Sequence, residues 1–273
     1  MELIKNRIVV KVGTSTLTNE QGKVNFLRIE KLARALSDMQ NLGFEVILVS
    51  SGAIAVGYGK MGLKERPTEL RFQQAAAAVG QCELMHLYDK FFSEYGKVVG
   101  QILLNSDDIG EPEKKNNLIN TFNSLLESGV IPIVNENDSV GHTEIETAEK
   151  LFGDNDTLSA VVAVLCQAGR LVLMSDVEGL YESDPRDNPQ ARLIRRVETI
   201  DQDIKDLARG AGSNRGTGGM ITKLQAAEIA MESGINMIIT HGKNPEALYD
   251  IISGEQVGTL FVGHRDPQEN AAS

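Results

Sequence analysis

The sequence has little cysteine. Its two cysteines, Cys82 and Cys166, lie in separate apolar segments of helical character and lack the spacing of metal ligands. This pattern argues against a disulfide framework and favours a reduced protein of the cytoplasm. The histidines are equally sparse and stand apart from one another, which argues against a histidine metal cluster. They are His86, His142, His241 and His264.

Positive charge and long apolar runs are also lacking. The formal net charge is −11 and the isoelectric point is near 4.9, which argues against a generic surface for nucleic acid or anionic membranes. A site for phosphate must therefore be built locally. No apolar run approaches the length of a membrane span, and the first residues pass into a strand without a secretory signal. We expect a cytoplasmic protein with neither nucleic-acid nor membrane partners.

Two common nucleotide motifs are missing. No segment fits G-x-x-x-x-G-K-[ST], so the chain is not an ordinary P-loop enzyme. Residues 57–62 match G-x-G-x-x-G, but they lie several residues past the preceding strand, and Pro67 follows where a helix should open. An acidic residue about 20 residues further on, at the end of the next strand, is lacking as well. We therefore reject a dinucleotide-binding site.

What the sequence does contain is an alternation of strand and helix patterns. Its 273 residues, 41% of them hydrophobic, suffice for a substantial core. Apolar runs predict strands at 8–12, 44–49, 98–104, 130–134, 171–174, 235–240 and 259–262, and helical periodicity predicts helices at 25–42, 69–94, 116–127, 157–167, 202–207, 220–232 and 246–252. Continuous apolar strands alternating with helices predict an α/β fold, a mainly parallel sheet covered by helices on both faces.

The division of the chain follows from one interruption. Residues 181–199 are rich in turn signals and break the alternation. We expect a single domain over residues 1–265, with a substrate half at about 1–170 and a nucleotide half at about 171–265. Residues 266–273 are expected to form a flexible tail.

The segment from Arg215 to Ala227 has the composition of a phosphate-binding loop. Glycines at 216, 218 and 219 allow close approach of the backbone to a ligand, and the following helix would aim its first N–H groups at an anion. Lys223 would lie one turn into that helix and reach a phosphoryl group. Taken alone, the motif is equally typical of a flexible loop before a surface helix.

Three strand ends strengthen the ligand-binding interpretation. Lys11 lies in an apolar run and is followed by Gly13, Thr14 and Ser15, which supply N–H and hydroxyl donors. A lysine at a strand end is often merely a surface residue, but burial in such a run is costly without an anionic partner. Ser51 and Gly52 follow the next strand. The loops 135–138 and 153–156 are acidic, and although such loops are often solvated turns or helix caps, we interpret them as binding a substrate amine and Mg·ATP.

Six motifs occur in order along the chain: 11–15 (KVGTS), 50–55 (SSGAIA), 73–81 (QQAAAAVGQ), 135–138 (NEND), 153–156 (GDND) and 216–223 (GTGGMITK). Together they closely resemble the glutamate 5-kinases, a family of the amino acid kinase superfamily, over residues 7–263. The first and last motifs alone also occur in carbamate, aspartate and acetylglutamate kinases. The serine-glycine, NEND and GDND motifs point to free glutamate.

The resemblance implies transfer of the ATP γ-phosphoryl group to the γ-carboxylate of L-glutamate, the first step of proline biosynthesis. The implied catalytic residues are Lys11, Lys223 and Asp156, with Asp156 orienting the two lysines. The implied substrate-binding residues are Ser51, Gly52, Asn135, Asp138, Asp154 and Asn155. The implied nucleotide-binding residues are Lys11, Gly13, Ser175, Asp176, Thr217, Gly218, Gly219, Met220, Ile221, Thr222 and Lys223.

Further expectations come with the family. They are ATP as co-substrate, Mg²⁺ bound chiefly through ATP, inhibition by proline, a homo-oligomer (dimer or tetramer) and hand-over of the labile product to glutamyl phosphate reductase. Two departures stand out: a C-terminal PUA domain, common in the family, is not expected here, and Ser175-Asp176 stands where many members have Thr-Asp. The alternatives are another acyl-phosphate kinase, acting on N-acetylglutamate or aspartate, and a non-catalytic amino-acid-binding regulator.

Overall fold

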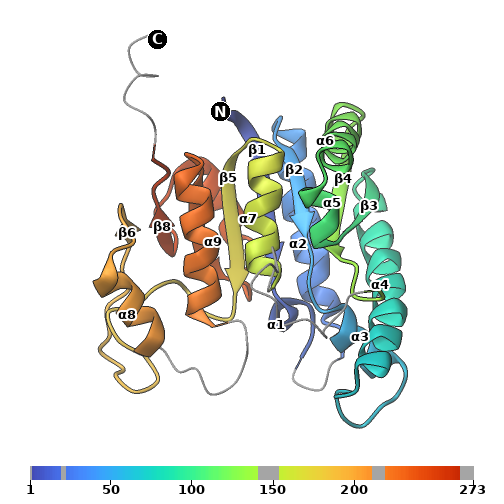
Figure 1. The fold of residues 1–273 in the computed structure, drawn as a ribbon, viewed down its shortest axis with the longest axis horizontal. Helices are drawn as coiled ribbons and strands as arrows, with labels where there is room; N and C mark the ends of the chain where they lie inside the picture. The colour runs from blue at the N-terminus through green and yellow to red at the C-terminus, as the bar shows by residue number, and fades with distance from the viewer. Residues whose placement is uncertain (1, 20–22, 141–153, 211–218, 265–273) are drawn as a thin grey trace.

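The computed structural model describes residues 2–19, 23–140, 154–210 and 219–264. Its strands form one sheet in the order β3-β4-β2-β1-β5-β7-β8-β6 (Figure 1). All neighbouring strands pair in parallel except β7 and β8. The strands are β1 (Ile4–Val12), β2 (Glu45–Val49), β3 (Val98–Leu104), β4 (Val130–Glu136), β5 (Ala168–Ser175), β6 (Arg196–Val197), β7 (Asn236–His241) and β8 (Thr259–Phe261).

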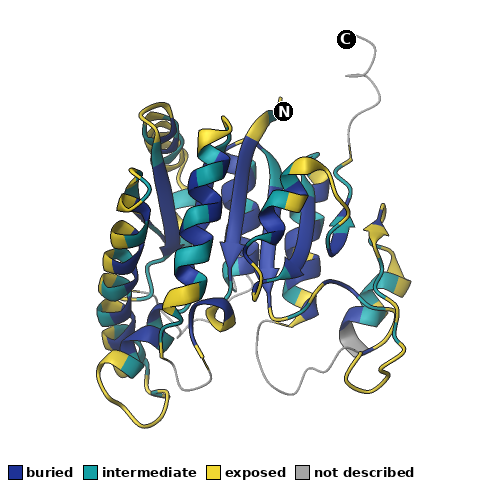
Figure 2. Cartoon of the chain, turned by 180° about the vertical axis from the view of Figure 1, so that it is seen from behind, coloured by how far each residue is buried: buried dark blue, intermediate teal, exposed yellow. Residues whose placement is uncertain are grey.

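Helices cover both faces of the sheet, as the sequence predicts (Figures 1 and 2). One face packs against α6 (Pro112–Glu127), α7 (Asn155–Leu165), α8 (Gln202–Gly210) and α9 (Met220–Glu232). The other packs against α2 (Phe26–Asn41), α3 (Ala53–Lys60), α4 (Leu70–Ser93) and α10 (Ala247–Ser253). Two short helices, α1 (Thr14–Leu17) and α5 (Ser106–Gly110), follow β1 and β3. Within the described residues no helix has both the length and the apolar character needed to cross a bilayer.

Alternation along β1 decides where its lysine points. Ile8, Val10 and Val12 belong to the core beneath α2, α3 and α4. Val9 belongs to the opposite core, beneath α6, α7 and α9. Because successive side chains of a strand point to opposite faces, Lys11 lies on the same face as Val9. β1 therefore directs its ammonium group toward the α7 side of the sheet.

Helices α3 and α4 touch through two glycines. A Cβ atom on Gly57 would overlap the carbonyl of Ala76, and one on Gly80 would overlap the carbonyl of Ala53. The G-x-G-x-x-G pattern thus begins inside a helix, where its first glycine serves packing. This placement agrees with the rejection of a dinucleotide loop.

The predicted elements agree with the structure to within a few residues, with three differences. The helix expected to run to Gln167 ends at Leu165, and Gln167 adopts a positive φ of 53°. The turn-rich segment 181–199 contains the two-residue strand β6, which pairs with β8. The sequence did not predict helices α1, α3 and α5. The expected tail, residues 266–273, lies outside the described residues.

Candidate active site

The site lies at the carboxyl ends of β1, β2, β4 and β5. From β1 the chain continues to β2 on one side, whereas β5 pairs with β1 on the other. Ligands of open α/β sheets bind at such a reversal of strand order. A cavity of about 380 Å³ opens there. Its lining residues are Lys11, Gly13, Thr14, Ser15, Ser51, Gly52, Ala53, Ile54, Ala55, Arg66, Glu136, Asp138, Asp154, Asn155, Asp156, Ser175, Asp176 and Lys223.

One carboxylate holds two lysines at the inner end of this cavity. Asp156 Oδ1 lies 2.6 Å from Lys11 Nζ, and Asp156 Oδ2 lies 3.1 Å from Lys223 Nζ. The three residues are 3%, 8% and 4% exposed, in the order Asp156, Lys11, Lys223. Thr222 Oγ1 donates a hydrogen bond to Asp156 Oδ2 at 3.0 Å. The cluster carries a net positive charge, which suits the binding of an anion.

Three elements meet to form this cluster. Lys11 comes from β1, Asp156 from the first turn of α7 and Lys223 from the first turn of α9. Asp154 caps α7, because its Oδ1 accepts hydrogen bonds from the backbone N–H groups of Asp156 and Thr157 at 2.6 and 3.1 Å. The cap fixes the first turn of α7 and thus the position of the Asp156 carboxylate.

Burial and charge act on the two carboxyls in opposite directions. For Asp156, burial by itself raises the pKa, but the ammonium groups of Lys11 and Lys223 outweigh it, so the pKa is lowered. For Asp154, burial and then the neighbouring Asp156 charge raise the pKa. Asp156 is therefore ionised at neutral pH, as its role between two lysines requires.

Asn155 ties together the loops at the ends of β2 and β4. Its Nδ2 lies 2.9 Å from the Ser50 carbonyl, 2.9 Å from Ser51 Oγ and 3.0 Å from Asn135 Oδ1. Gly52 has a φ of +87°, which favours glycine, and its carbonyl accepts a hydrogen bond from the Val56 N–H at 2.9 Å at the start of α3. The structure thus brings the predicted Ser51, Gly52 and Asn155 to the cavity wall, whereas the predicted Asn135 lies buried behind it and contacts Asn155.

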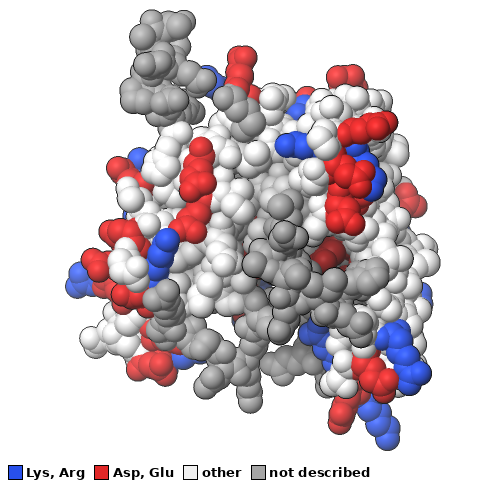
Figure 3. Space-filling model, viewed as in Figure 1, with Lys and Arg blue, Asp and Glu red and all other residues white. Residues whose placement is uncertain are grey.

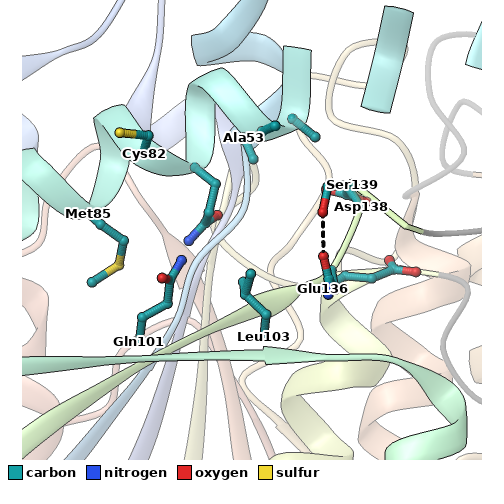
Figure 4. A pocket seen from close by; sticks show the side chains of 12 residues that line it. Ala53, Cys82, Met85, Gln101, Leu103, Glu136, Asp138 and Ser139 are labelled. Atoms are coloured by element: carbon teal, nitrogen blue, oxygen red, sulfur yellow. Dashed lines mark hydrogen bonds between the residues drawn. The ribbon is translucent and has the colours of Figure 1, made fainter. Parts of the chain in front are cut away.

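Two acidic side chains from the end of β4 and the residues just after it line the cavity as well. Glu136 and Asp138 line the site cavity and also a neighbouring cavity of about 430 Å³, with Ala53 shared as well. Figure 4 shows Glu136 and Asp138 on one side of that neighbouring cavity, with Met85, Cys82 and Gln101 on the other. The shared carboxyl side chains lie where the two cavities adjoin.

Five of the residues predicted to bind the nucleotide line the site cavity: Lys11, Gly13, Ser175, Asp176 and Lys223. The predicted Gly219, Met220, Ile221 and Thr222 are not among its lining residues. Ser175 ends β5 and donates a hydrogen bond from Oγ to Asp176 Oδ1 at 2.9 Å. Gly13 follows β1, where an added Cβ would lie 3.8 Å from Lys11 Nζ. Gly219 caps α9, in whose first turn Met220 is buried and Ile221 is 45% exposed. Thr217 and Gly218 lie outside the described residues.

Some lining residues were missed by sequence reasoning. Glu136 lies inside the NEND motif, so its position at a strand end was an available signal. Arg66 lies in the loop after α3, and nothing in that loop's sequence identifies it as a site residue. Of the described residues, no group of three or more His, Cys, Asp or Glu side chains is arranged to hold a metal ion.

Comparison with known proteins decides the family. Residues 6–241 match the amino acid kinase family. The chain is 56% identical over 259 residues to the glutamate 5-kinase of Clostridium perfringens, and the alignment covers 95% of this chain and 96% of that protein. The chain belongs to the glutamate 5-kinases of the amino acid kinase family. It is therefore a kinase, and the resemblance drawn from the six motifs is confirmed.

Other relatives agree with this membership. The glutamate 5-kinase of Listeria innocua is 54% identical over 267 residues, with 97% of this chain and 96% of that protein covered. Among solved structures, the UMP kinase of Bacillus anthracis has a TM-score of 0.63 at 17% identity, covering 95% of this chain and 97% of that one. An isopentenyl phosphate kinase also has a TM-score of 0.63, at 18% identity, covering 93% and 99%. These structural likenesses support the fold and confirm its predicted class.

Proposed function

We propose that the chain transfers the γ-phosphoryl group of ATP to the γ-carboxylate of L-glutamate, giving L-glutamyl 5-phosphate for proline biosynthesis. The observation that carries the proposal is the pair of buried lysines held on Asp156 in a cavity that Glu136 and Asp138 also line. The glutamate 5-kinases at 56% and 54% identity support the same reaction. Both halves of the reaction therefore have candidate residues in one cavity.

The chemistry asks for alignment and charge neutralisation. The γ-carboxylate of glutamate has a pKa of about 4.3 and is already ionised at neutral pH, so no general base is required. Its oxygen attacks the γ-phosphorus, the bond from that phosphorus to the β,γ-bridging oxygen breaks, and ADP leaves with the electron pair. Lys11 and Lys223 would neutralise charge on the transferring group and the β-phosphate. Asp156 would keep both ammonium groups in position.

Substrate and nucleotide would bind at opposite ends of the cavity. Ser51 and Asn155 would hold glutamate, with Asp138 paired to its α-ammonium group. Ser175, Asp176 and the residues 217–223 would hold the nucleotide. Gly13, Gly52, Asn135 and Asp154 complete the proposed binding set. An N-acetylated substrate would leave Asp138 without a cation, so free glutamate is favoured over N-acetylglutamate.

Mg²⁺ would enter with ATP. The ion usually takes one or two carboxylates together with substrate phosphates. Asp154 and Asp176 are carboxylates on the cavity wall and fit that requirement. When bound, Mg²⁺ supplies charge neutralisation on the phosphates.

Other parts of the proposal concern the protein's surroundings. Proline shares the α-carboxylate and α-amino group of glutamate, so it would compete for the same residues. We also propose a homo-oligomer, a cytoplasmic location and transfer of the labile acyl phosphate to glutamyl phosphate reductase, as suits an enzyme early in a biosynthetic route.

The test of the proposed function is ATP-dependent formation of an acyl hydroxamate in the presence of hydroxylamine. Glutamate, N-acetylglutamate and aspartate are compared at equal concentration. We expect product with glutamate and little with the other two. A preference for N-acetylglutamate or aspartate would favour the alternative acyl-phosphate kinases, and no ATP consumption with any of them would favour a regulator that binds amino acids.

A further inference from the structure

Gln81 lies outside the proposed binding set but contacts it directly. It comes from α4, near the end of the motif 73–81, and its Oε1 accepts a hydrogen bond from Asn135 Nδ2 at 2.9 Å. Asn135 is only 1% exposed. Among the described residues, Gln81 is the hydrogen-bond acceptor of this buried amide group. Its loss would leave an amide donor unsatisfied in the interior.

The other side of the Asn135 carboxamide faces the substrate loop. Its Oδ1 accepts from the backbone N–H of Glu136 at 2.9 Å and from Asn155 Nδ2 at 3.0 Å. A reversed carboxamide would turn its NH₂ group toward these two donors, so the Glu136 N–H would lose this acceptor and Asn155 Nδ2 would keep only the Ser50 carbonyl and Ser51 Oγ. Gln81 therefore orients the Asn135 carboxamide, whose oxygen in turn accepts a hydrogen bond from the Asn155 amide.

Helix α4 is well suited to support this contact. Gly80, the neighbour of Gln81, packs directly on the carbonyl of Ala53 at the start of α3. Two turns along α4, the buried Tyr88 hydroxyl lies 2.8 Å from Ser50 Oγ, in the residue whose carbonyl also accepts from Asn155. α4 thus contacts the substrate wall at three points.

We propose that Gln81 is a positioning residue for the amino-acid substrate: it fixes the Asn135 carboxamide and, through it, the Asn155 amide that binds glutamate. The inference rests on the proposed function for the identity of the substrate. Gln81 itself would not touch the reacting atoms. Its effect should therefore fall on the binding of glutamate and spare the binding of ATP.

The experiment compares Gln81→Met, which keeps the shape but removes the strong acceptor, with Gln81→Glu, which keeps an acceptor oxygen. Gln101→Met is the matched control, because Gln101 lines the same neighbouring cavity from β3 and its side chain makes no hydrogen bond to another described residue (Figure 4). We expect Gln81→Met to raise KM for glutamate on the order of tenfold, as an unsatisfied buried donor would. KM for ATP should stay within twofold, Gln81→Glu should recover most of the loss, and Gln101→Met should resemble the wild type.

A second measurement is independent of the substrate. A double-mutant cycle of Gln81→Met and Asn135→Ala, read from the free energy of unfolding in urea, should be clearly non-additive if the two side chains interact. An additive cycle, or equal rises of KM for glutamate and ATP in Gln81→Met, would overturn the inference. In a further outcome, the wild type fails to phosphorylate glutamate while the double-mutant cycle stays non-additive. That result would reject the proposed function alone, because the interaction of Gln81 with Asn135 would still be supported.

Discussion

At the scale of single residues, the site depends on the Asp156 carboxylate. Each of its oxygens contacts one buried ammonium group. Two lysines in a protein interior would repel each other and lose hydration without such a partner. The pairing therefore explains how β1 and α9 can each place a positive charge beside the same cavity.

Lys223→Met should lower kcat on the order of 10²–10³ and leave KM for glutamate nearly unchanged, because the charge that Lys223 neutralises grows mainly in the transition state. Lys11→Ala should behave similarly. The measurement is steady-state kinetics, with Lys205→Met as control because Lys205 pairs with Glu228 at the surface. A near-normal kcat with only a raised KM for ATP would contradict the catalytic role.

Asp156→Asn should destabilise the fold by about 3–5 kcal/mol at neutral pH, because two buried lysines lose their partner. The folded-state pKa of Asp156 is lowered from its ordinary value of 3.8. The stabilisation it gives is therefore complete above that ordinary value and is lost as the pH falls through the folded-state value. Urea unfolding between pH 7 and pH 3 should thus find the difference between wild type and variant constant down to about pH 4 and beginning to shrink below it. A difference that stays constant to pH 3, or grows there, would disagree with this assignment.

At the scale of helices and strands, the contact between α3 and α4 positions the substrate loop. Gly80→Ala would place a Cβ against the Ala53 carbonyl at the start of α3. Such overpacking typically costs about 1–3 kcal/mol, and relief by movement of α3 would displace Ser51 and Gly52. We expect a lower melting temperature and a raised KM for glutamate.

Gly110→Ala is the matched control for this helix contact, because an added Cβ at Gly110 meets nothing within 4 Å. Thermal melting and kinetics on both variants separate the specific contact from the general effect of replacing a glycine. Equal behaviour of the two variants would mean that the α3–α4 contact tolerates a methyl group.

The same elements mark what the sequence could and could not predict. Apolar runs located the strands, and helical periodicity located the long helices, because both signals are local. The sequence did not predict α3, because its glycines are typical of a loop and the helix is stabilised by packing on α4. β6 has only two residues, and its pairing depends on β8, far along the chain.

The site also contains residues that the sequence could predict and residues that it could not. Lys11 and Asn135 lie near the carboxyl ends of their strands and Ser51 follows β2, so a parallel sheet predicts that they lie close together. The central role of Asp156 came from the family resemblance. Gln81 and Arg66 belong to α4 and to the loop before it, and only the tertiary structure brings them to the substrate wall.

At the scale of the whole molecule, charge is confined to local arrangements. On the face in Figure 3, acidic and basic side chains are interspersed over the described surface, and they form no continuous basic patch there. With a net charge of −11, long-range attraction would not favour an anionic nucleotide. In the proposed function, ATP would therefore be held at short range by the buried Lys11 and Lys223.

The central claim is that a glutamate carboxylate oxygen attacks the phosphorus of ATP in this cavity. The most direct measurement uses glutamate labelled with ¹⁸O in its γ-carboxylate, with hydroxylamine present to cleave the acyl phosphate at its carbonyl carbon. The transferred oxygen leaves with phosphate, so ³¹P NMR should find one ¹⁸O atom in the inorganic phosphate released in each turnover. Phosphate without the label would mean that water, and not glutamate, receives the phosphoryl group, and would contradict the account.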